Sequence, residues 1–68
     1  MERTMQQVEC EVWKAINGDF ANVHQERTPG GIHRYWFDYP KIDGTGTTKE
    51  QARANFKRNA LAWIERNI

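Results

Sequence analysis

The sequence predicts an α+β domain in which a three-stranded antiparallel β-meander is followed by one long C-terminal α-helix packed on the sheet. Two observations lead to this prediction. Segments rich in strand-forming residues alternate with turn motifs over residues 8–39, and residues 48–67 contain neither glycine nor proline. The 68 residues suffice for one small domain, residues 1–68. We expect a polar start at 1–7, the sheet at 8–39, a loop at 40–47 and the helix at 48–67.

The first hairpin is predicted from an alternation and a turn dipeptide. Apolar and acidic residues alternate from Val8 to Val12, which is the period of a half-buried strand. Asn17-Gly18 follows, and this dipeptide favours a type I′ turn because both central positions need positive φ. We therefore expect residues 20–27 to pair back on residues 8–16.

A second turn separates the next two predicted strands. In Thr28-Pro29-Gly30-Gly31, proline presets φ and Gly30 can take the positive φ that a type II turn requires. Residues 32–39 are rich in β-branched and aromatic side chains, and Pro40 ends the predicted strand. The glycine- and threonine-rich stretch that follows, residues 43–46, is interpreted as a loop.

The helix is predicted from its start signal and its apolar stripe. Thr47 with Glu50, or Thr48 with Gln51, forms a capping box at the beginning of the unbroken stretch. At about 100° per residue, five residues share one stripe that should face the sheet. These are Ala52, Phe56, Ala60, Trp63 and Ile64.

More apolar surface is predicted than one helix can cover. Leu61 and Ile68 lie beside the helix stripe, and the predicted second sheet face is aromatic. An uncovered apolar face on a small domain indicates a partner or a second copy of the chain. The predicted protein interface consists of Trp13, Phe20, Tyr35, Phe37, Tyr39, Leu61 and Ile68.

A basic row supports an alternative. Lys49, Arg53 and Lys57 recur every four residues along the predicted helix, and such a row can follow the phosphates of a nucleic acid. The net charge of only +1 argues against a strongly basic nucleic-acid-binding module, and the row also fits a solvated helix flank.

Several chemistries are not expected. One cysteine allows no internal disulfide, and the chain has no C-x-x-C motif for zinc. The spacing of His24 and His33 fits no metal signature, and residues 43–49 lack the order of a phosphate-binding loop. We expect no catalytic residues, no cofactor and no metal. The absence of a membrane-spanning or secretory segment favours a cytoplasmic location.

These observations lead to two hypotheses about function. The first is a non-enzymatic accessory protein, of a kind found in bacteria or phages, that self-associates as a homodimer and binds a protein partner. The alternative is a small DNA- or RNA-binding regulator that uses Lys49, Arg53 and Lys57.

Overall fold

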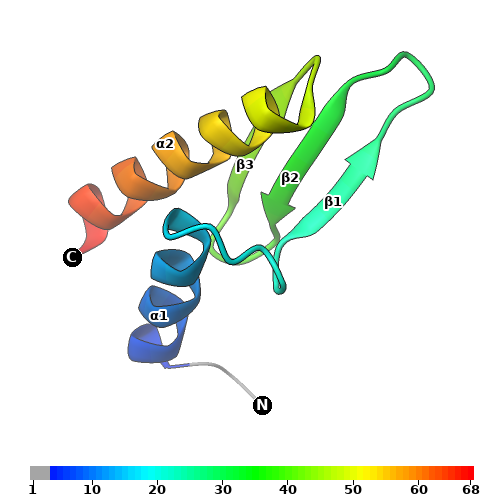
Figure 1. The fold of residues 1–68 in the computed structure, drawn as a ribbon. Helices are drawn as coiled ribbons and strands as arrows, with labels where there is room; N and C mark the ends of the chain where they lie inside the picture. The colour runs from blue at the N-terminus through cyan, green and yellow to red at the C-terminus, as the bar shows by residue number, and fades with distance from the viewer. Residues whose placement is uncertain (1–3) are drawn as a thin grey trace.

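The computed structural model describes residues 4–68 and confirms the predicted fold class, with one additional helix at the N-terminus (Figure 1). The elements are α1 (Met5–Ile16), β1 (His24–Arg27), β2 (His33–Phe37), β3 (Ile42–Gly46) and α2 (Lys49–Asn67). The strands form one antiparallel sheet in the order β1-β2-β3. The chain thus folds as a small α+β domain in which α2 packs along the sheet and α1 packs against α2.

The predicted first strand at residues 8–16 is wrong, because these residues belong to α1. The helix begins with a capping box: the Thr4 hydroxyl accepts from the Gln7 backbone N–H, and the Gln7 side chain accepts from the Thr4 backbone N–H. Val8, Val12 and Ala15 are buried, at the i, i+4, i+7 spacing of a helix face. Because positions 8 and 12 satisfy both periods, the alternation alone was ambiguous.

Asn17-Gly18 ends this helix instead of turning a hairpin. Gly18 has φ +100°, and its N–H donates to the Ala15 carbonyl, while the Asp19 N–H donates to the Lys14 carbonyl. This pair of hydrogen bonds is the Schellman motif, which requires the same left-handed conformation that a type I′ turn would. The expected positive φ is therefore found at Gly18 but not at Asn17, whose φ is −85°, and the dipeptide lies at a helix end.

The three strands lie later in the sequence than predicted, so that the predicted second and third strands become the first two strands of the sheet. β1 and β2 lie inside the predicted second and third strands, whereas β3, residues 42–46, lies inside the loop predicted at 40–47. Tyr35 lies opposite Gln25 on one side and Gly44 on the other. In the turn between β1 and β2 the positive φ falls on Gly31, not on Gly30.

α2 lies unusually close to β3 because two glycines face it. A Cβ atom on Gly44 would lie 2.3 Å from the Phe56 backbone nitrogen, and one on Gly46 would lie 2.7 Å from that of Ala52. At this short separation the Asn55 and Asn59 side-chain amides donate to the Thr45 and Asp43 carbonyls, each at 2.7 Å. The free edge of β3 is therefore hydrogen-bonded to the helix.

The core lies between the sheet and the two helices. Ala52, Phe56, Ala60 and Ile64 are buried as predicted, and Trp63 packs against them partly buried. The Phe56 ring meets Phe20 and Phe37 edge-on, with centroids 5.8 and 5.4 Å apart. The remaining buried hydrophobic residues of the core come from α1, the sheet and the segment before β1: Val8, Val12, Ala15, Val23, Tyr35, Phe37 and Ile42.

We predict that Gly44→Ala destabilises the domain by roughly 3 kcal/mol or more, because the new methyl group would overlap backbone atoms that cannot rotate away. Gly30→Ala is the matched control, since its Cβ would find only the Thr28 hydroxyl at 3.8 Å, and it should change stability by less than about 0.5 kcal/mol. Urea denaturation of both variants measures the difference. Equal stabilities would contradict the close helix–strand contact.

Candidate functional site

The predicted aromatic interface does not form as one exposed surface. Tyr35 and Phe37 are buried beneath α2, at 2% and 5% exposure, and Phe20 is partly buried against the same core. The reason is that the strands pair differently from the prediction, with β2 between β1 and β3, and in this sheet Tyr35 and Phe37 face α2. The prediction that these two residues are available to a partner is wrong.

The other members of the predicted interface remain exposed on separate elements. Trp13 lies on α1, Tyr39 in the turn between β2 and β3, and Leu61 and Ile68 toward the end of α2. Their exposed fractions range from 39% for Trp13 to 63% for Tyr39. Isolated exposed apolar residues are normal on small proteins, so this set alone indicates no specific partner.

The structure keeps the predicted basic row together on one flank of α2. Lys49, Arg53 and Lys57 follow one another at four-residue steps, about 6 Å apart along the helix axis. Among residues 4–68, none of the three forms an ion pair with a carboxylate. The basic row therefore presents unneutralised positive charge to the solvent.

Two members of this row, Arg53 and Lys57, lie over the rings of Phe20 and Tyr35, which we call the aromatic shelf. The Arg53 guanidinium carbon lies 5.2 Å from the Phe20 ring centre and 5.5 Å from that of Tyr35, and the Lys57 ammonium lies 5.8 Å from that of Phe20. The Arg53 Nε–H also donates to the Tyr35 hydroxyl at 3.3 Å. Cation–π contacts and this hydrogen bond orient the two cations over the core edge.

Next to the start of the row lies a small pocket between β1, β2 and α2, which we call the β1–α2 pocket. It has a volume of about 200 Å³. Its lining residues are Gln25, Glu26, Arg27, His33, Tyr35 and Lys49. Arg27 and His33 lie directly opposite each other on β1 and β2, and Lys49 belongs to both the pocket and the basic row. Two cationic side chains and one imidazole, from three elements, thus converge at this point.

Sequence reasoning missed Arg27 and His33 as members of a basic site. The sequence indicated His33 only together with His24, as a pair whose spacing fits no metal signature. Strand alternation could have found them. Residues 33 and 35 lie on the same face of a strand, so His33 shares the face of the core residue Tyr35, and Arg27 pairs with His33.

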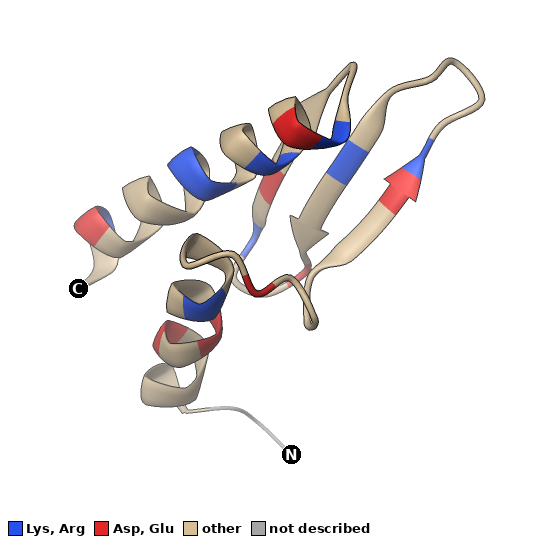
Figure 2. Ribbon diagram, in the orientation of Figure 1, with Lys and Arg blue, Asp and Glu red and all other residues tan. Residues whose placement is uncertain are grey.

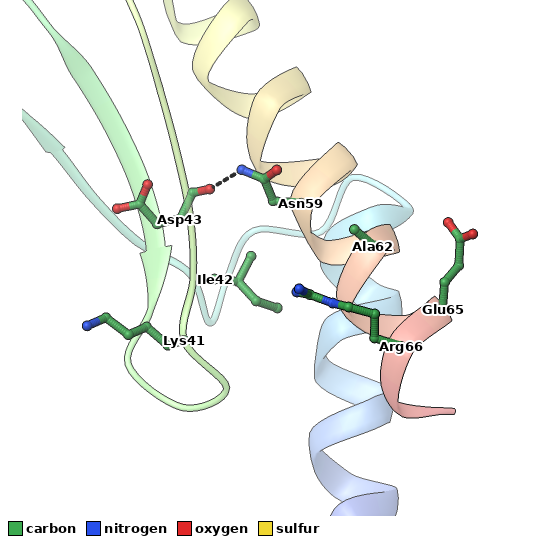
Figure 3. A pocket seen from close by; sticks show the side chains of 7 residues that line it. All are labelled: Lys41, Ile42, Asp43, Asn59, Ala62, Glu65 and Arg66. Atoms are coloured by element: carbon green, nitrogen blue, oxygen red, sulfur yellow. Dashed lines mark hydrogen bonds between the residues drawn. The ribbon is translucent and has the colours of Figure 1, made fainter.

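A larger open groove lies at the opposite end of α2, between the start of β3 and the last helical turns (Figure 3). It has a volume of about 600 Å³ and is lined by Lys41, Ile42, Asp43, Asn59, Ala62, Glu65 and Arg66. Its charged side chains are of both signs and point in different directions (Figure 3). The Asp43 carbonyl already accepts from Asn59. The groove therefore lacks convergent groups for one ligand.

On the outer sheet face, which points away from α2, charged side chains pair with one another. Arg34 forms an ion pair with Asp43 at 3.0 Å and lies 4.5 Å over the Trp36 ring. His24 stacks on Trp36 with centroids 5.4 Å apart and contacts Asp38 at 3.0 Å. Because these groups pair with one another, the outer face carries no unbalanced charge row comparable to that on α2.

The described residues form no other candidate site. Within the described part of the chain, no cluster of three or more histidine, cysteine or acidic side chains is arranged to hold a metal ion. No helix between residues 4 and 68 has the length and apolar character needed to cross a membrane. No family model, curated protein or solved structure matches this chain.

We predict a measurable energetic coupling between Phe20 and Arg53. In a double-mutant cycle of Phe20→Leu and Arg53→Gln, unfolding free energies should show a coupling of about 0.5–1 kcal/mol, because the ring and the guanidinium contact each other. A parallel cycle of Phe20→Leu with Arg66→Gln should be additive, since Arg66 lies at the far end of α2. Additivity in both cycles would show that the aromatic shelf does not hold the row.

Proposed function

We propose that this chain is a small nucleic-acid-binding domain, without catalytic activity, that contacts the sugar–phosphate backbone through Lys49, Arg53 and Lys57. The observation that carries the proposal is that the row is intact, solvent-facing and free of carboxylate partners among the described residues. Of the seven residues that favoured protein binding, in contrast, Tyr35 and Phe37 are buried and Phe20 is partly buried, so they do not form one exposed surface with the other four. This comparison reverses the order of our two sequence-based hypotheses.

The distribution of charge supports this choice. α2 carries five basic and two acidic residues, whereas α1 carries Glu9 and Glu11 against Lys14 alone (Figure 2). The net charge of +1 is therefore the sum of a basic helix and more acidic parts of the chain. A local positive field can bind phosphate even when the whole molecule is nearly neutral.

The mechanism expected of such a row is electrostatic. Each lysine or arginine that neutralises a phosphate releases a condensed counterion, so affinity falls with salt at a slope near −0.9 per contact on duplex DNA. The first turn of α2 adds the positive end of the helix dipole, although the Thr48 hydroxyl already accepts from the Gln51 N–H there. Glu50, in the same turn, opposes this field in part. Such contacts position a backbone without reading its bases.

We predict that the double variant Lys49→Gln/Lys57→Gln weakens binding to a generic DNA duplex at low salt and flattens the salt slope by up to about two units. Fluorescence anisotropy across a salt series measures both quantities. The matched control is Lys14→Gln/Lys41→Gln, which removes the same charge from α1 and from the turn before β3. Arg53 is left unchanged in this test because its contacts to Tyr35 and Phe20 link it to folding.

Two results would contradict the proposal. One is the absence of any salt-dependent binding by the unmodified chain to DNA or RNA duplexes. The other is an equal loss of affinity in the control variant, which would show that overall charge, rather than the basic row, is responsible.

Binding through protein contacts is our second proposal, supported by the exposure of Trp13, Leu61 and Ile68 on the two helices. Under this hypothesis the chain forms a homodimer at tens of micromolar. Leu61→Gln shifts it toward monomer, because the dimer would bury the exposed leucine side chain and glutamine removes that apolar contact. Light scattering measures the mass. A monomer of 8.0 kDa at this concentration would contradict self-association.

A further inference from the structure

The β1–α2 pocket brings together three cationic or protonatable side chains that have no partner within residues 4–68. Arg27 comes from β1, His33 from β2 and Lys49 from the first turn of α2. Among the described residues, none of them has a hydrogen bond or an ion pair. Elsewhere on the sheet the comparable groups are paired: Arg34 with Asp43, and His24 with Asp38. The pocket is thus the place on the sheet where two cationic side chains and an imidazole meet without a partner among the described residues.

Size and surroundings restrict what the pocket can take. A volume of about 200 Å³ accommodates a single phosphate group with its water, but is below the range of about 300–1,000 Å³ typical of sites for larger ligands. Gln25 adds an amide that can donate to a phosphate oxygen, and the Tyr35 ring closes the inner wall. Glu26 is the one carboxylate among the lining residues.

We propose that the β1–α2 pocket holds one phosphate group of the bound nucleic acid, and that protonated His33 strengthens this contact, so that binding depends on pH. This inference rests on the proposed function. Lys49 lines the pocket and begins the basic row, so a backbone that follows the row can place its next phosphate between Arg27 and His33. The contact surface then extends from α2 onto the sheet.

The sign of the pH effect follows from the charges that face His33. Arg27 on β1 and Lys49 on α2 are positive, Glu26 on β1 is negative, and the residue opposite on β3 is the uncharged Gly46. Histidine side chains change charge between about pH 5 and 8, and only the imidazolium attracts a phosphodiester. Affinity should therefore rise as the pH falls through this range.

The test measures binding of the full chain to a DNA duplex of about 20 base pairs, at several salt concentrations and at about pH 6 and about pH 8. We expect about three- to fivefold tighter binding at the lower pH, with a salt slope steeper by about 0.9. His33→Gln should remove both differences. His24→Gln should retain them, because His24 lies on the opposite sheet face.

His33→Lys provides a positive test that keeps the charge. This variant should bind at about pH 8 as tightly as the unmodified chain does at about pH 6, and should lose the pH dependence, because lysine stays protonated at both values. If His33→Gln does not fold, this variant decides the question by itself. An unchanged pH response in either His33 variant would overturn the inference, as would loss of the response in His24→Gln.

The outcomes separate this inference from the proposed function. If the unmodified chain shows no salt-dependent binding, the proposed function fails. If it binds in a salt-dependent manner but equally at both pH values, the basic row stands and the phosphate pocket is overturned.

Discussion

The structure depends on the direct contact between the backbone of α2 and that of β3. At Gly44 there is no room for a side chain, because even a methyl carbon would lie 2.3 Å from the Phe56 nitrogen. This contact fixes the height of the helix above the sheet, so Phe56 reaches between Phe20 and Phe37 and is completely buried. The helix position in turn places Arg53 and Lys57 over the aromatic shelf. In this domain, two small residues in a strand thus determine where the charged residues of a helix can act.

The sequence was most informative where one signal had one structural meaning. The long helix has a threonine cap, no internal breaker and a single buried stripe, and residues 49–67 fold as expected. The hairpin between β1 and β2 was also placed correctly, apart from which glycine takes positive φ. The sequence was misleading where a signal had two meanings. Asn17-Gly18 satisfies a helix end as well as a hairpin, and Val8 and Val12 fit a helix as well as a strand.

Long-range contacts explain the remaining errors. Gly44 and Gly46 reduce strand propensity locally, and only their closeness to α2 shows why glycine is required in β3. The resulting shift of the sheet decided the prediction of the site. Lys49, Arg53 and Lys57 follow from helix periodicity alone, so their common flank could be predicted. The positions of Arg27 and His33 depend on the strand register. This register could not be predicted because β3 was not recognised as a strand.

The amide side chains of Asn55 and Asn59 have a consequence for how this sheet can be extended. They occupy carbonyls along the free edge of β3, so an incoming strand would have to displace the helix before it could pair there. The opposite edge, β1, stays accessible, but its four residues His24–Arg27 are all exposed and polar or ionisable. Strands of this composition resist the edge-to-edge association that leads to aggregation. The domain therefore protects one edge by hydrogen bonds from its own helix and the other by the solvation of polar side chains.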